Sequence, residues 1–171
     1  LTLTDLSLLG LGMDWLRNIE SASLTGGAGH NKLTATAFTL GSVTLIGGAG
    51  NDTIQGGSHH DSIDGGVGND ALMGNFGNDV LFGGAGKDTL LGGIDDDSLF
   101  GGQHDDVLIG GFGEDLLNGE EGNDKFTGGQ GADGEPRYGN STANDGDVID
   151  NVGGEIVDET IATLFPFESP G

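Results

Sequence analysis

The sequence predicts an all-β fold, a right-handed parallel β-roll: a β-helix solenoid of nine-residue repeats with eighteen residues per turn and an N-terminal β-helical cap. Three observations predict it. A Gly- and Asp-rich motif recurs every nine residues, one position of the motif is always apolar, and 37 Gly in 171 residues leave few large side chains for a globular core. We expect a degenerate, largely metal-free cap over residues 1–46, the repeat array over 47–136, and a C-terminal capping segment and tail over 137–171.

The repeat begins at Gly47 and continues through nine units to Thr127 without a slip in register. Its Gly-rich first half suits left-handed turns, and positions seven to nine favour a short strand. Position six is Asp in every unit and position eight is always apolar, so position eight should point into a narrow shared interior. The units read GGAGNDTIQ, GGSHHDSID, GGVGNDALM, GNFGNDVLF, GGAGKDTLL, GGIDDDSLF, GGQHDDVLI, GGFGEDLLN and GEEGNDKFT.

Two units should close one turn, which stacks each Asp on the Asp eighteen residues later at the strand spacing of roughly 4.8 Å. Calcium needs oxygens at about 2.4 Å, and twice that distance matches the spacing, with carbonyls of the turns completing the shell. We therefore expect two ladders with up to about eight calcium sites between turns. The candidate ligands are Asp52, Asp70, Asp88, Asp106 and Asp124 in one ladder, and Asp61, Asp79, Asp97, Asp115 and Asp133 in the other.

The net charge of the chain limits the classes of partner that it can bind. Asp and Glu number 28 against 5 Lys and Arg, a net charge of -23, which argues against nucleic acid and against an anionic membrane as partners. No apolar run is long enough to span a bilayer, so we expect no membrane insertion by this segment. The absence of Cys excludes disulfides and thiolate zinc sites. Cations are the expected partners, and because like charges repel in the empty coil, binding and folding should be one event.

Several units depart from the pattern. His59, Asp95 and His104 replace Gly at position four, and Asn75 and Glu120 replace Gly at position two. A left-handed backbone is strained at residues other than Gly, so these turns should bind calcium less well.

The flanking segments are less regular. Residues 26–34 fit the motif with Asn31 in place of Asp, and residues 26–46 contain no acidic residue, so this stretch should bind metal poorly. Trp15 fits a cap over the open end of the coil better than a ligand platform. Pro136 ends the array. Beyond it, Asp145 and Asp147 are candidate ligands for one further ion.

The units resemble the repeats-in-toxin (RTX) consensus GGxGxDxUx, with U a large apolar residue, over just over half of the chain. The resemblance implies a bacterial protein that leaves the cell unfolded through a type I secretion apparatus and folds on extracellular calcium. It also implies an extracellular or cell-surface location and a larger parent protein. In the family, the position-six Asp and carbonyls of the turn bind calcium.

The sequence gives less support to other functions. The four His residues lie at turn positions and no catalytic set can be assembled from the spacing, so we expect no catalysis. The main alternative is a polysaccharide- or surface-binding module of an adhesin or secreted enzyme, for which Phe82 and Phe100 form a short stripe. A zinc site at His59 and His60, or an enzyme fragment using His59 or His104, is less favoured. A flexible acidic linker would not keep one apolar position in nine.

Overall fold

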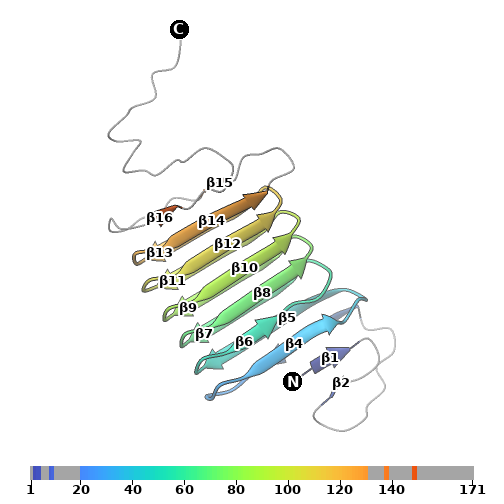
Figure 1. Cartoon of the computed structure of the whole chain (residues 1–171). Coiled ribbons are helices and arrows are strands. Elements are labelled where there is room, and N and C mark those ends of the chain that lie inside the picture. Colours follow the sequence, from blue (N-terminus) through green and yellow to red (C-terminus); the bar gives the residue numbers. More distant parts are fainter. Residues whose placement is uncertain (1, 5–7, 10–19, 131–136, 139–147, 150–171) are drawn as a thin grey trace, which may run out of the picture.

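The computed structural model describes residues 2–4, 8–9, 20–130, 137–138 and 148–149. Every regular element in this part of the chain is a β-strand. The strands alternate between two facing sheets, so the chain winds as a solenoid with turns along both sides (Figure 1). The predicted all-β parallel roll is therefore confirmed. No helix in the described part of the chain is long and apolar enough to cross a membrane.

The nine-stranded sheet faces the viewer in Figure 1. All its neighbours pair in parallel except the first two strands, which are antiparallel. In sheet order it contains β16 (Val148–Ile149), β14 (Lys125–Gln130), β12 (Val107–Phe112), β10 (Thr89–Ile94), β8 (Ala71–Phe76), β6 (Thr53–Gln55), β4 (Lys32–Ala37), β1 (Thr2–Thr4) and β2 (Leu8–Leu9).

The seven-stranded sheet lies behind it and is parallel throughout. In sheet order it contains β15 (Arg137–Tyr138), β13 (Leu116–Glu121), β11 (Ser98–Gln103), β9 (Val80–Ala85), β7 (Ser62–Val67), β5 (Ser42–Ala49) and β3 (Ser21–Thr25).

The register within the repeat array is eighteen residues. Leu90 pairs with Leu72 on one side and with Leu108 on the other. In the second sheet Leu99 pairs in the same way with Leu81. Two nine-residue units therefore make one turn, as the sequence predicts, and equivalent positions of every second unit lie directly above one another.

The core is one cluster of apolar side chains that both sheets contribute to the space between them. Position eight supplies one buried residue per unit, and each fully buried Leu or Ile stabilises the roll by about 1.5–3 kcal/mol. No other position of the nine repeat units from Gly47 to Thr127 contributes a buried large apolar group. The core comprises Leu24, Leu33, Ala35, Phe38, Val43, Leu45, Ile54, Ile63, Leu72, Leu81, Leu90, Leu99, Leu108, Leu117 and Phe126.

The turn that precedes the array is three residues longer. Ser21 pairs with Ser42 and Lys32 with Thr53, both twenty-one residues apart rather than eighteen. The buried side chain of Phe38 lies in the longer segment, whose chain folds back through a bond from the Phe38 amide to the Ala35 carbonyl. The motif at residues 26–34 thus belongs to the solenoid but lies outside the eighteen-residue register.

Some sequence expectations lie outside the described residues. These concern the Trp15 cap, the candidate ligand Asp133, and the possible additional ligands Asp145 and Asp147.

Candidate metal centre

The position-six Asp residues form two buried columns, one along each side of the coil. Nine of the ten candidates are described, and none is more than 3% exposed. Burial of ionisable groups without cations beside them is unfavourable, so each carboxylate needs compensating partners. These nine residues are Asp52, Asp61, Asp70, Asp79, Asp88, Asp97, Asp106, Asp115 and Asp124.

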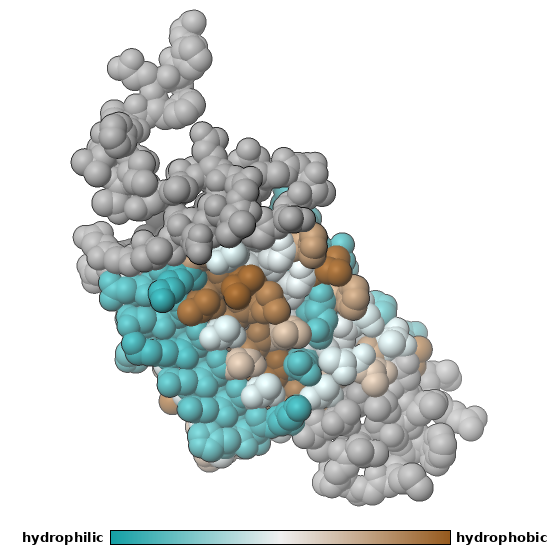
Figure 2. Space-filling model, viewed as in Figure 1, coloured by the Kyte–Doolittle hydropathy of each residue, from teal (hydrophilic) through white to brown (hydrophobic). Residues whose placement is uncertain are grey.

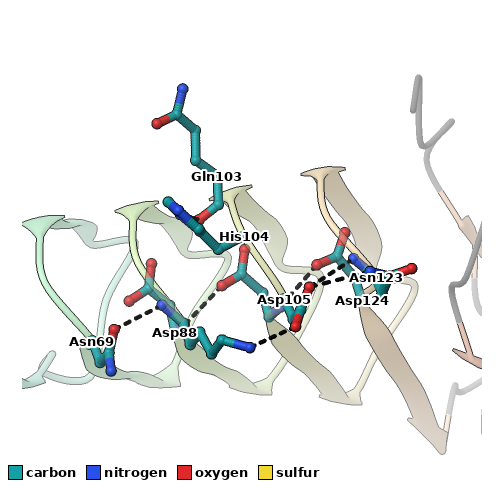
Figure 3. Close-up of polar contacts among 9 residues, drawn as sticks. Asn69, Asp88, Gln103, His104, Asp105, Asn123 and Asp124 are labelled. Carbon is teal, nitrogen blue, oxygen red and sulfur yellow. Dashed lines mark hydrogen bonds and ion pairs between the residues drawn. The ribbon is translucent and has the colours of Figure 1, made fainter. Parts of the chain in front are cut away.

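One oxygen of each carboxylate binds the backbone of the preceding turn. The Asp70 amide donates to Oδ1 of Asp88 at 2.7 Å, and the Asp79 amide donates to Oδ1 of Asp97 at 2.8 Å. The same bond recurs along both columns with a separation of eighteen residues. Figure 3 shows Asp88 and Asp124 in one such column. The ladder is therefore built of amide-to-carboxylate bonds, a feature that the stacking argument from the sequence did not predict.

The second oxygen, Oδ2, has no hydrogen-bond partner in eight of these residues although it is buried. A buried acceptor without a partner costs roughly 1–3 kcal/mol, and more when it is charged. The regular recurrence of eight such atoms in two columns indicates repeated binding sites rather than eight independent defects. The residues are Asp52, Asp70, Asp79, Asp88, Asp97, Asp106, Asp115 and Asp124.

A backbone carbonyl lies near seven of these unpartnered oxygens, across the Gly at position one. A Cβ added to Gly65 would lie 2.5 Å from Oδ2 of Asp70 and 2.7 Å from the carbonyl oxygen of Gly83 in the next turn. A Cβ added to Gly101 would meet the corresponding pair of oxygens at 2.5 and 2.8 Å. Only Gly leaves this space open, so carboxylate and carbonyl oxygens converge on the gap between turns.

The electrostatics of the columns favour a cation. Burial, together with the nearby charges of Asp61, Asp97 and Asp95, raises the pKa of Asp79 to about 8, although a bond from the Asp61 amide opposes the rise. Burial likewise raises the pKa of Asp97 to about 7. A divalent cation beside these groups would stabilise their ionised form.

The donor set fits calcium. Buried carboxylates and turn carbonyls are hard oxygen ligands, which calcium accepts in variable number and geometry. Among the described residues, no three His, Cys, Asp or Glu side chains gather into a metal-binding group, so His59, His60 and Asp61 form no such group. Each gap would instead depend on carboxylate oxygens together with main-chain carbonyls.

Asp61 is an exception to the pattern. Its Oδ2 accepts a bond from the Gly57 amide at 2.5 Å, and its Oδ1 accepts one from the Val43 amide at 2.8 Å. Val43 stands where the column would have an Asp, eighteen residues before Asp61. A Cβ on Gly57 would lie 2.9 Å from the Phe38 carbonyl oxygen, so this turn packs on the longer segment upstream. Both oxygens of Asp61 are thus satisfied by the protein.

Left-handed backbone occurs at four of the five substituted positions. Asn75 and Glu120 have φ of 86° and 67°, and Asp95 and His104 have φ of 81° and 83°. The left-handed backbone expected at His59 is wrong, because its φ is not positive. His59 lies in the same turn as Asp61, the turn that departs from the column pattern. Neither Gly57 nor His59 in this turn has a positive φ.

A second, outer ladder joins the position-five residues, and the sequence analysis did not identify it. The Lys87 amide donates to Asn69 Oδ1 at 2.9 Å, and the Asn123 amide donates to Asp105 Oδ1 at 3.2 Å. Lys87 also pairs with Asp105 at 2.5 Å. Figure 3 shows Asn69, Asp105 and Asn123 of this ladder. The frequent Asn and Asp residues at position five are the sequence pattern from which this ladder could have been predicted. This ladder bonds each turn to the next without a buried charge.

The remaining sequence candidates lie on the surface. Phe82 and Phe100 stack with ring centroids 5.1 Å apart. His30 and His60 take part in position-five bonds, in which their Nδ1 atoms accept from the amides of Asn51 and Asn78.

Comparison with known proteins gives one family. The chain matches the model of the RTX calcium-binding nonapeptide repeat (4 copies) over residues 44–72, 67–99 and 100–134. The matched stretches contain both Asp columns from Asp52 onward. No curated protein matches the chain significantly.

Proposed function

The chain belongs to the RTX calcium-binding nonapeptide repeat family, a calcium-binding repeat module, and from this premise we propose that it folds when calcium enters the gaps between its turns. The observation that carries the proposal is the double column of buried Oδ2 atoms without partners. Seven of these atoms face a carbonyl of the next turn, so calcium would complete both groups at once.

Among the described residues, seven gaps between turns suit an ion. Each has an unpartnered Oδ2 and a position-one carbonyl eighteen residues after the Gly of the same unit. Asp124 has an unpartnered Oδ2, but the turn that would follow it is not described. Asp61 is omitted because the Gly57 amide already binds its Oδ2. The seven gaps are those of Asp52, Asp70, Asp79, Asp88, Asp97, Asp106 and Asp115.

Coupled folding follows from the cost of the metal-free roll. Folding buries columns of carboxylates whose pKa values rise on burial, so at neutral pH the metal-free folded chain is destabilised relative to the unfolded chain. Many Gly residues add a large loss of backbone entropy. Calcium binding offsets both terms because the complete site forms only in the folded coil.

We further propose that the segment is a structural part of a larger bacterial protein. A chain that is unfolded at low calcium could pass through a type I secretion apparatus and become rigid in the calcium outside the cell. Its location would then be extracellular or on the cell surface. Catalysis would reside elsewhere in the parent protein, since this family is a structural module.

Native mass spectrometry in calcium, with magnesium as the control, tests the site proposal. We expect at least seven tightly bound calcium ions and weaker, incomplete loading by magnesium, whose shorter and stricter shell fits the gaps poorly. Binding of only one or two calcium ions would contradict the repeated-site proposal.

The alternative function is recognition of a polysaccharide or cell surface. The stacked rings of Phe82 and Phe100 support it, since Phe82 is 41% exposed on the outer face of the seven-stranded sheet. The stripe is short, because the neighbouring residues in register are Asp64 and Asn118. Co-sedimentation of the calcium-loaded chain with insoluble polysaccharides, compared with Phe82→Ser, tests this function. Equal sedimentation of both proteins would exclude a role for the stripe.

A further inference from the structure

The strands of the nine-stranded sheet contain no carboxylate. Their only charged residues in the described part of the chain are Lys32 and Lys125. The strands of the other sheet carry Asp64, Glu120 and Glu121, and the chain as a whole has 28 acidic residues. An acidic segment can therefore approach this face without the repulsion that it would meet elsewhere.

The same face carries an apolar patch over β8, β10 and β12. Positions nine and three of three successive turns align there in register. Phe76 is 54% exposed and Phe112 56% exposed. Figure 2 shows hydrophobic residues gathered on this face, with hydrophilic residues along the turns. The apolar patch consists of Met73, Leu91, Ile109, Phe76, Ile94 and Phe112.

A patch of this kind usually marks an interaction site, because water-exposed apolar surface is unfavourable. A second copy of the chain is a poor occupant. It would bring another strongly negative molecule close, and the patch offers no carboxylate to pair with the lysines of the copy. An occupant with apolar side chains and negative charge fits the face better.

The residues after β16 have this composition. The segment 150–171 contains no Lys or Arg, and the basic residue nearest before it in the sequence is Arg137. Its acidic residues include Asp158 and Glu159, beside an apolar stretch. The apolar residues of the segment from 156 onward include Ile156, Val157, Ile161, Leu164, Phe165 and Phe167.

The segment follows β16, which belongs to the same nine-stranded sheet as the apolar patch. β16 pairs with β14, with Val148 opposite Lys125. From β16 to β10 there are three strand spacings, about 14 Å in total. The eleven residues 150–160 can span at most about 36–40 Å when extended, so the stretch from Ile161 onward reaches the patch with chain to spare.

We propose that residues 156–167 dock on the apolar patch and cover it. The aliphatic and aromatic side chains of the segment pack on Leu91 and its neighbours, and its carboxylates lie toward the lysine-bearing ends of the face. The proposal requires the folded roll, but it is separate from the proposal that calcium drives folding.

Disulfide trapping in the full chain tests the docking, because the sequence has no Cys of its own. One variant combines Leu91→Cys with Phe165→Cys. The matched control combines Phe82→Cys with Phe165→Cys, since Phe82 occupies the same repeat position on the opposite sheet. In calcium we expect an intrachain disulfide to form at least about tenfold faster in the first variant, because docking raises the effective concentration of the thiols.

Equal rates in the two variants would overturn the proposal, as would predominant formation of disulfide-linked dimers through residue 91. Circular dichroism of both proteins in calcium separates this outcome from a failure to fold. A second measurement needs no disulfide: Phe165→Ser should increase the fluorescence of a hydrophobic dye by uncovering the patch. Unchanged fluorescence would also contradict the docking.

Discussion

The backbone amide of Asp70 donates to Oδ1 of Asp88, eighteen residues later, at 2.7 Å, while Oδ2 of Asp88 is buried without a partner. The two oxygens of one carboxylate thus have different roles. Oδ1 joins neighbouring turns through the main chain, and Oδ2 remains available for a cation. This division explains how a nearly invariant Asp can be both a structural and a metal-binding residue.

Replacing Asp88 by Asn should lower the number of bound calcium ions, because an amide nitrogen in the position of Oδ2 cannot bind a cation. We expect a loss of one to two ions, since neighbouring gaps in the stack are coupled. Native mass spectrometry measures the count. Asp61→Asn is the matched control and should leave the count unchanged, since Gly57 and Val43 already satisfy that side chain. A similar loss in both variants would show that Asp61 binds calcium as the other residues do.

Gly65→Ala should weaken calcium-dependent folding. The new methyl group would lie 2.5 Å from Asp70 Oδ2 and 2.7 Å from the Gly83 carbonyl oxygen, so both must shift out of the gap. We expect a loss of about 1–3 kcal/mol in unfolding free energy with calcium present. Denaturant unfolding measures it. Gly27→Ala is the control, because no atom lies within 4 Å of the added methyl group. Equal stability of the two variants would refute the crowding at position one.

Leu90→Ala should destabilise the calcium-loaded roll by about 2–5 kcal/mol, because Leu90 is fully buried between Leu72 and Leu108. Leu116→Ala provides a control of the same chemical type at a position that is 38% exposed, and its cost should be far smaller. Thermal or denaturant unfolding in excess calcium compares the two proteins. Comparable costs would mean that position eight does not form the core.

In a chelator, the chain should gain β-structure as the pH falls. The folded-state pKa of Asp79 is raised to about 8 and that of Asp106 to about 7, above the ordinary value of an exposed Asp. The folded state therefore binds more protons than the unfolded state, and its stability decreases as pH rises from about 4 to 8. Circular dichroism at pH 8 and pH 5 measures the change, with sedimentation to exclude aggregation. An unchanged spectrum would contradict the burial of these carboxylates.

Much of the fold follows from the sequence because the repeat has a single period. Asp at position six and an apolar residue at position eight fix the pitch, the core column and the two Asp columns. Exceptions at single residues cannot be predicted from the repeat pattern. The divergent turn of Asp61 depends on the three extra residues between Asn31 and Val43, which lie against it only in the folded coil.

The apolar patch was also missed, since the residues that form it are spread over three turns and two repeat positions. The alignment of Phe82 and Phe100 follows from the sequence, because they share one repeat position eighteen residues apart. Phe76, Ile94 and Phe112 show the same spacing at position three. Their common face becomes evident only when the turns of the two sheets are assigned.

The most direct measurement of the central claim is far-ultraviolet circular dichroism of the chelator-stripped chain during a calcium titration at neutral pH, with a parallel magnesium titration. We predict a cooperative change from coil to β-structure with calcium and little change with magnesium at the same concentrations, since only calcium suits the gaps between turns. A spectrum that is already rich in β-structure without calcium, or that remains a coil at saturating calcium, would contradict calcium-driven folding.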